Sequence, residues 1–148
     1  FNSKANAIVI RTSWLYSSHG NNFVKTMLRL GKEKDALNVV GDQIGSPTYA
    51  RDLAKACIKI ITTKDFGANP RAYHYANSGS ISWFDFASKI MALKELDCKV
   101  RSITTEEYPT KAARPKYSVL STQDIEKDFG VEVPEWEKSL KECLDKIS

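Results

Sequence analysis

Two stretches of this chain constrain its fold most, because each runs from a short apolar segment through a polar loop toward a segment of helical periodicity. In the first, residues 7–10 (AIVI) lead into residues 11–16 (RTSWLY). In the second, residues 37–40 (LNVV) lead into residues 41–48 (GDQIGSPT). Short β-branched runs are typical of buried strands, and open α/β sheets bind ligands where loops leave the carboxyl ends of strands. We therefore expect an α/β fold with its ligand site at these loops.

Helix signals follow both loops. Asn21 or Asn22 can cap a first helix, because a side-chain oxygen satisfies free N–H groups at a helix start. Pro47 predicts that a second helix opens at residues 46–48, since proline is favoured at the first helical position. The expected core face of that second helix consists of Leu53, Ala54, Cys57, Ile58 and Ile61.

Strands and helices continue to alternate downstream. Residues 72–76 and 100–103 are expected strands, residues 66–70 an expected loop, and residues 106–116 an irregular segment because two prolines interrupt it. Three helices are predicted: one capped by Ser82, one ended by Gly130, and one starting near Trp136. This alternation favours α/β packing.

Length and composition suit one globular domain: 148 residues, of which 42% are hydrophobic and 27% charged. No apolar run is long enough to span a membrane, so no membrane contact is expected. The net charge is +4 without a dense Lys/Arg cluster, so no nucleic-acid partner is expected either. Cys57, Cys98 and Cys143 are widely spaced, which favours free thiols in a reducing cytoplasm. The chain starts at Phe1, and we expect it to be a piece of a longer protein.

Several catalytic motifs are missing from the sequence. No glycines are spaced as G-x-G-x-x-G, the pyrophosphate cradle of dinucleotide-binding folds. No tyrosine is followed four residues later by lysine, the pair that donates the proton in short-chain reductases. No spacing of metal ligands is visible. We therefore assign no catalytic and no metal-binding residue, and expect no hydride transfer from this chain alone.

The two loop stretches carry a family resemblance. Residues 11–16, residues 20–23 (GNNF), residues 26–30 (TMLRL) and residues 42–48 (DQIGSPT) follow one another in order and spacing. Together they resemble the C-terminal half of the dTDP-4-dehydrorhamnose reductase family, within the extended short-chain dehydrogenase/reductase superfamily. Residues 108–115 (YPTKAARP) continue the match, which covers nearly the whole chain.

The resemblance implies an architecture and an activity. Residues 1–148 would be the C-terminal, substrate-binding part of a Rossmann-type reductase, with a small substrate lobe. NADPH would bind mainly to an N-terminal domain, and the substrate would be a dTDP-sugar whose 4-keto group is reduced. Family members also suggest a homodimer and the involvement of Mg²⁺. Two alternatives stay open: a non-catalytic relative of the methionine adenosyltransferase regulatory-subunit type, and another nucleotide-sugar epimerase or dehydratase.

The same resemblance assigns substrate contacts. Trp14 would pack on the sugar, because an indole face suits the C–H patches of a deoxysugar; otherwise it closes the sheet as a core residue. Arg114 would bind the diphosphate, or else form a surface ion pair. The positions of the other candidates for nucleotide or sugar contacts, at the loops and helix starts, are what suggest them: Asn21, Asn22, Phe23, Gln43, Ser46 and Thr48. The two asparagines could instead be a helix cap and a turn, and the loop of Gln43, Ser46 and Thr48 could be only a capped turn.

Overall fold

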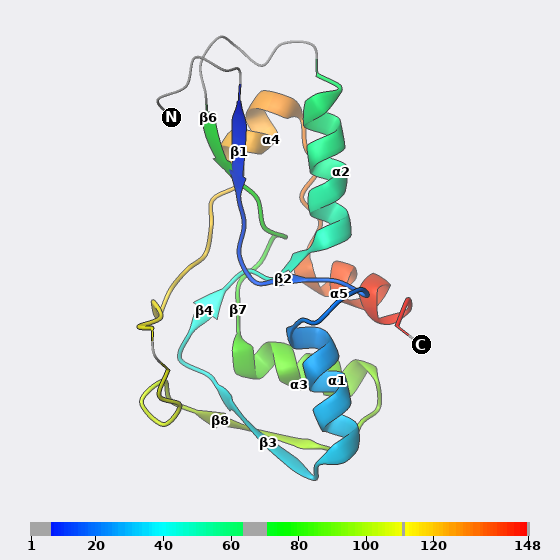
Figure 1. Ribbon diagram of the computed structural model, residues 1–148, viewed down its shortest axis with the longest axis vertical. Helices are drawn as coiled ribbons and strands as arrows, with labels where there is room; N and C mark the ends of the chain where they lie inside the picture. Colours follow the sequence, from blue (N-terminus) through cyan, green and yellow to red (C-terminus); the bar gives the residue numbers. More distant parts are fainter. Residues whose placement is uncertain (1–6, 64–70, 111, 148) are drawn as a thin grey trace.

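The computed structural model describes residues 7–63, 71–110 and 112–147, and arranges them as two lobes joined by a central layer (Figure 1). The elements, in chain order, are β1 (Ile8–Arg11), β2 (Leu15–Tyr16), α1 (Phe23–Glu33), β3 (Ala36–Val40), β4 (Ile44–Gly45), β5 (Thr48–Tyr49), α2 (Ala50–Ile61), β6 (Arg71–His74), β7 (Ile81–Ser82), α3 (Trp83–Leu93), β8 (Lys99–Ile103), α4 (Gln123–Phe129) and α5 (Trp136–Leu144). The predicted loop 66–70 lies outside the described residues.

The β1–β6 lobe, which we define as β1, α2, β6 and α4, forms the upper part of Figure 1. Its two strands are parallel, from Ile8 opposite Arg71 to Arg11 opposite His74. Helices α2 and α4 flank them, and a small core fills the space between: Ala56, Ile60, Tyr73, Tyr75, Ile125, Phe129 and Val131.

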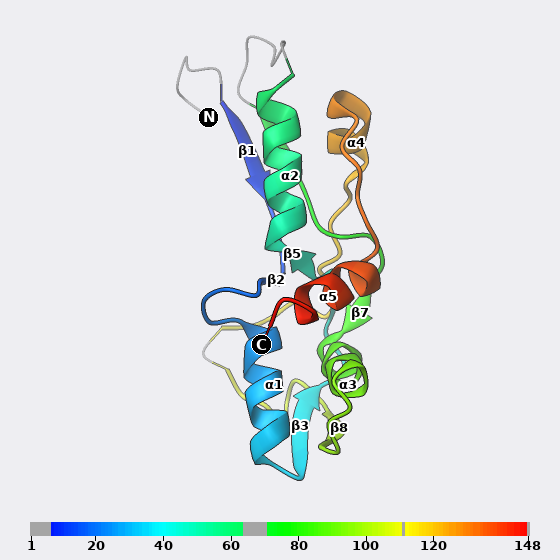
Figure 2. The ribbon, with the colours of Figure 1, turned by 90° about the vertical axis from the view of Figure 1, so that its right-hand side faces the viewer.

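The β3–β8 lobe consists of α1, β3, α3 and β8. Strands β3 and β8 are parallel, from Ala36 opposite Lys99 to Val40 opposite Ile103. Figure 2 shows β3 between α1 and β8, with α3 packed against the strand pair. Phe86 and Ile90 of α3 are completely buried in the larger core, which extends to Leu140 and Cys143 of α5.

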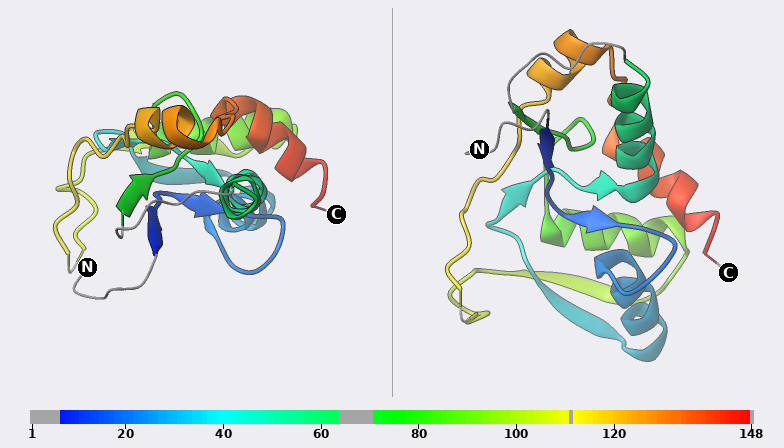
Figure 3. Two further views of the ribbon diagram at one scale, coloured as in Figure 1. Left: turned by 90° about the horizontal axis from the view of Figure 1, so that it is seen from above. Right: turned by 45° about the horizontal axis from the view of Figure 1, so that its top comes forward.

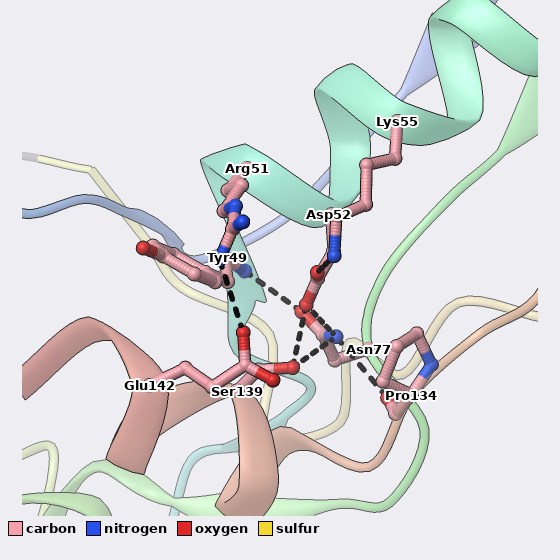
Figure 4. A network of polar contacts seen from close by, with 8 residues as sticks. All are labelled: Tyr49, Arg51, Asp52, Lys55, Asn77, Pro134, Ser139 and Glu142. Atoms are coloured by element: carbon pink, nitrogen blue, oxygen red, sulfur yellow. Dashed lines mark hydrogen bonds and ion pairs between the residues drawn. The ribbon is translucent and has the colours of Figure 1, made fainter.

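The central layer contains short strand pairs and α5 (Figure 3). Strands β2 and β5 are parallel, whereas β4 and β7 are antiparallel. A buried polar network ties the lobes together here (Figure 4). The Asp52 carboxylate accepts hydrogen bonds from Asn77 Nδ2 at 2.9 Å and from the Ser139 hydroxyl, while Asn77 Oδ1 accepts one from the Tyr49 N–H at 2.7 Å. These contacts join three parts of the chain: α2, the segment that follows β6, and α5. They also give the buried Asp52 carboxylate the hydrogen-bond donors that a buried charge requires.

The helix caps and the helix stop that the sequence predicts are confirmed where no longer-range contact competes with them. Asn22 caps α1, with its side-chain oxygen accepting from the Lys25 N–H at 3.3 Å. Ser82 caps α3 by accepting from the Asp85 N–H at 3.0 Å. Gly130 ends α4 with φ 59°, a left-handed conformation that glycine adopts at little cost.

The prediction for the second helix is wrong in two respects. Helix α2 begins at Ala50, because Thr48 and Tyr49 pair with β2 instead of opening the helix. Its buried face consists of Asp52, Ala56 and Ile60, whereas Ile58 and Ile61 of the expected core face are 63% and 71% exposed. Among the described residues, no helix has the length and apolar character needed to cross a membrane.

Candidate functional site

A cavity of about 390 Å³ opens in the β3–β8 lobe. This volume falls within the range of small-molecule sites. It is bounded by α1, β3, the first residue of α3 and the segment after β8. Its lining residues are Phe23, Thr26, Met27, Leu30, Leu37, Asn38, Val39, Val40, Gln43, Trp83, Tyr108, Thr110 and Arg114.

Three of the predicted site residues meet in this cavity. Phe23 is the first residue of α1, Gln43 follows β3, and Arg114 lies in the irregular segment after β8. No carboxylate of the described residues pairs with Arg114, which is exposed to solvent. Lys111, whose charge lies near it in sequence, is outside the described residues. The cavity therefore combines an apolar wall with a free guanidinium group.

Trp14 lies beside the cavity rather than in its lining. Its ring stacks on that of Trp83, with ring centroids 3.5 Å apart and planes inclined by 11°. Trp83 in turn contacts Phe23, at a centroid distance of 4.6 Å. Trp83 and Phe23 both line the cavity, so Trp14 is joined to its aromatic wall through Trp83.

The backbone around Trp14 is built to hold this ring in place. Trp14 has φ 45°, a left-handed conformation that costs a non-glycine residue about 1–3 kcal/mol. Its carbonyl accepts from the Thr48 N–H at 3.1 Å, and its ring lies directly over Gly45, where an added Cβ would be 2.5 Å from Cε2. Such strain tends to persist at functional positions, where the surroundings fix it.

Asn21 and Asn22 occupy the start of α1 but do not line the cavity. Asn22 is engaged within the fold, because its Nδ2 donates to the Ser17 carbonyl at 2.7 Å and to the His19 carbonyl at 3.3 Å while Oδ1 caps the helix. Asn21 is exposed. Asn22 thus fixes the loop of residues 17–19 against the helix that carries Phe23.

Ser46 and Thr48 are placed inside the molecule, 2% and 0% exposed. The Ser46 hydroxyl donates to the Gly79 carbonyl at 2.7 Å, and the Thr48 hydroxyl pairs with that of Thr12 at 3.1 Å. These two side chains hold the central layer together.

Sequence reasoning missed part of the lining. Trp83 was not among the predicted site residues, and Tyr108 was noted only for the resemblance of its segment. The aromatic residue directly after the cap Ser82 was a usable signal, since a residue at a helix start lies at the edge of the core. The edge of β3, which contributes residues 37–40, carries no sequence signal because its backbone groups are the same in any strand.

One carboxylate near the cavity is strongly hydrogen-bonded. Asp42 Oδ1 accepts from the Thr105 hydroxyl at 2.7 Å and from the Thr105 N–H at 2.9 Å. The hydroxyl hydrogen bond, more than any other contact, holds the pKa of Asp42 below its usual value. Asp42 therefore stays ionised at neutral pH.

Comparison with known proteins places this geometry in a family. The model of the RmlD substrate binding domain matches residues 1–148. The chain belongs to this family. Among curated relatives, the spore coat polysaccharide biosynthesis protein SpsK of Bacillus subtilis is 49% identical over 95% of this chain and 47% of its own length. The dTDP-4-dehydrorhamnose reductase of Aggregatibacter actinomycetemcomitans is 43% identical over 91% of this chain and 49% of its own length.

A solved family structure supports the same assignment. The dTDP-4-dehydrorhamnose reductase of Bacillus anthracis, crystallised with NADP, superposes with a TM-score of 0.87 at 42% identity, over 97% of this chain and 49% of that one. The predicted α/β fold, that of the C-terminal part of a Rossmann-type reductase, is therefore confirmed. The chain spans about half the length of the curated relatives it matches.

Proposed function

We propose that residues 1–148 are the substrate-binding part of a dTDP-4-dehydrorhamnose reductase, and that the cavity holds the nucleotide of its dTDP-sugar. The reaction is the NADPH-dependent reduction of the 4-keto group of dTDP-6-deoxy-L-lyxo-4-hexulose to dTDP-L-rhamnose. The observation that carries the proposal is the convergence of Phe23, Gln43 and Arg114, far apart in sequence, on one cavity.

The thymine base fits against the edge of β3. Successive strand residues point to opposite faces, so a cavity lined by all of residues 37–40 must run along the strand edge. In the described part of the chain, β8 is the one strand that pairs with β3, which leaves N–H and C=O groups on the other edge. Thymine presents an acceptor, a donor and an acceptor in a row, which such an edge complements. Phe23 adds an aromatic surface for the base.

The diphosphate fits at Arg114. A guanidinium group binds phosphate oxygens through two parallel hydrogen bonds, and this one has no competing carboxylate among the described residues. Pro109 and Pro115 restrict the backbone of its segment, so that less entropy is lost when the loop closes on a ligand.

The sugar then lies toward Trp14. The aromatic residues Phe23, Trp83 and Trp14 contact one another in series, and the part of the Trp14 indole that Trp83 and Gly45 leave uncovered would pack on the apolar side of a deoxysugar and exclude water. The task of this chain is positioning, since hydride transfer requires the reacting atoms to be held about 3–3.5 Å apart. Asn21, Ser46 and Thr48 have no part in this arrangement, and Asn22 acts through the loop that it fixes.

The cofactor is assigned to another part of the protein. NADPH supplies the hydride, but the sequence has neither a glycine-rich cradle for its pyrophosphate nor a Tyr-x-x-x-Lys proton donor. The β1–β6 lobe offers the surface on which a cofactor-binding part would pack. There Val9, Ile58 and Ile61 are 44%, 63% and 71% exposed, and β1 pairs on one side with β6.

Further properties stay predictions: a homodimer and dependence on Mg²⁺ from the resemblance, and a cytoplasmic location from the free cysteines. For Mg²⁺, the described residues contain no group of three or more His, Cys, Asp or Glu side chains suited to a metal ion.

The activity test follows NADPH oxidation with the dTDP-4-keto sugar, using the protein as its gene encodes it. Turnover that falls at least about tenfold in Trp14→Ala and Arg114→Ala, but not in the exposed variant Lys127→Ala, supports the proposal. No turnover in the wild type, with dTDP still bound, favours another nucleotide-sugar enzyme. No turnover and no dTDP binding favours the non-catalytic relative.

The packing test uses Ile61→Asp in the same protein. A charge on the exposed face should reduce NADPH-dependent turnover while dTDP binding is kept, because the nucleotide cavity is in the other lobe. Lys59→Asp places the same charge on another side of α2 and is the control. Equal effects of the two variants would argue against this face as the packing surface.

A further inference from the structure

Three polar side chains form a chain of hydrogen bonds at the ends of β3 and β8. The parallel pairing of the strands, with Val40 opposite Ile103, brings the residues that follow them side by side. Asp42 Oδ1 accepts from the Thr105 hydroxyl at 2.7 Å, and Gln43 Nε2 donates to the same hydroxyl oxygen at 3.1 Å. The chain thus runs from a carboxylate to an amide that lines the cavity.

The chemistry of these groups fixes the direction of each hydrogen bond. An ionised carboxylate only accepts, and a hydroxyl has one hydrogen. The Thr105 hydrogen therefore goes to Asp42, and the Thr105 oxygen can only accept from Gln43. An amide oxygen in place of Nε2 would face another acceptor. The two orientations of a glutamine amide often have similar energies, but here the orientation with Nε2 toward Thr105 is much lower in energy.

The amide oxygen of Gln43 has no hydrogen-bond partner within residues 7–63, 71–110 and 112–147. Gln43 Oε1 makes no hydrogen bond to any described residue, and its side chain is part of the cavity wall. Gln43 lies three residues after the end of β3 and, like Arg114, is one of the polar residues that line the cavity. A nucleotide that occupies the cavity would therefore lie against both side chains.

We propose that Thr105 and Asp42 lock the Gln43 amide with its oxygen toward the cavity, where it accepts a hydrogen bond from the 3′-hydroxyl of the nucleotide's deoxyribose. This inference rests on the proposed function. The base is a poorer partner, because its one donor is already satisfied by the edge of β3. Gln43 is then a specificity-determining residue, and Thr105 and Asp42 are positioning residues that do not touch the ligand.

The test measures the preference for a 3′-hydroxyl. Calorimetric titration of the protein, as its gene encodes it, compares dTDP with 2′,3′-dideoxythymidine diphosphate and with N3-methyl-dTDP. We expect the wild type to bind dTDP about five- to tenfold more tightly than the dideoxy nucleotide, which corresponds to one hydrogen bond.

The variants distinguish a loss of the Gln43 amide orientation from a general loss of folding. Thr105→Val frees the Gln43 amide to rotate, so the preference should fall to about twofold or less. Thr105→Ser keeps the hydroxyl and should keep the preference. The matched control is Thr104→Val, because the exposed Thr104 hydroxyl bonds only to Glu107 among the described residues. Gln43→Met removes the acceptor itself and should abolish the preference. This variant tests the inference independently if Thr105→Val does not fold.

Three results would overturn the inference while dTDP binding leaves the proposed function intact. The first is that the wild type binds dTDP and the dideoxy nucleotide equally well. The second is that Thr105→Val keeps the full preference for dTDP over the dideoxy nucleotide. The third is that Gln43→Met loses only the discrimination against N3-methyl-dTDP and keeps the preference for the 3′-hydroxyl. Failure of the wild type to bind dTDP at all would instead reject the proposed function, and this inference with it.

Discussion

The two lobes differ in how completely they bury their apolar side chains. In the β3–β8 lobe, Phe86 and Ile90 are fully buried between helices and strands, and a cavity opens elsewhere in the same lobe. In the β1–β6 lobe, Ile58 and Ile61 of α2 lie largely in solvent. Parallel strands are normally covered on both faces. The comparison shows that the β3–β8 lobe, together with α5, buries its large apolar side chains, whereas the β1–β6 lobe presents some of its own on a surface suited to a further layer.

The largest expected effect contrasts the two lobes directly. Phe86→Ala should lower the free energy of unfolding by about 3–5 kcal/mol, because it leaves a cavity in a closed core. Ile61→Ala should change it by at most about 0.5 kcal/mol in this chain, because its side chain is exposed. Urea denaturation of the 148-residue chain measures both. Similar losses in the two variants would mean that the lobes do not differ as described.

The joint between the lobes should be the next most sensitive place. Asp52→Ala removes the acceptor of the Ser139 hydroxyl and should cost about 1–3 kcal/mol, since this buried donor is left unpaired while Asn77 Nδ2 keeps the Pro134 carbonyl and Ser139 Oγ as acceptors. Asp97→Ala, at an exposed site, is the control. Urea unfolding followed by circular dichroism would detect the difference. A loss no greater than in the control would show that the network does not support the joint.

A change at Gly45, which supports the Trp14 ring, should lower the free energy of unfolding less than Asp52→Ala does, but should weaken substrate binding more. Gly45→Ala places a methyl group against the indole, so the ring must move, at about 1–2 kcal/mol of stability. Near-ultraviolet circular dichroism should lose the signal of the Trp14–Trp83 stack, and activity with the dTDP-sugar should fall. An unchanged spectrum would show that the indole does not lie over residue 45.

The smallest effect concerns two of the three thiols: Cys57 lies in the β1–β6 lobe, whereas Cys143 lies on α5 in the larger core. Burial raises the pKa of Cys143 to about 11, so at pH 8 almost none of it is the reactive thiolate. Cys57 on α2 is only partly buried. Iodoacetamide should therefore modify Cys57 first and Cys143 only after unfolding in urea, as mass spectrometry of peptides would show. Equal rates in the folded protein would contradict the burial of Cys143.

The elements that sequence predicted well are those set by local interactions. The caps Asn22 and Ser82 and the stop Gly130 each act within one helical turn, so their effect is visible in the sequence. The start of α2 was predicted wrongly because Thr48 pairs with a strand more than thirty residues earlier, and this long-range contact overrides the proline signal.

The candidate site was predicted in part for the same reason. Phe23, Gln43 and Arg114 follow strand ends or lie in a loop, where ligand contacts are expected, and the structure brings them to one cavity. Trp83 and the edge of β3 were not foreseen, because their role depends on which face of each element is left uncovered. The hydrogen-bond chain from Asp42 to Gln43 requires the register of β3 and β8, which periodicity alone does not give.

The most direct test of the central claim is a crystal structure of the protein, as its gene encodes it, with dTDP bound. The account predicts the thymine along the edge of β3 beside Phe23, with the diphosphate within hydrogen-bond distance of Arg114. A dTDP molecule bound elsewhere, with this cavity empty, would contradict the account.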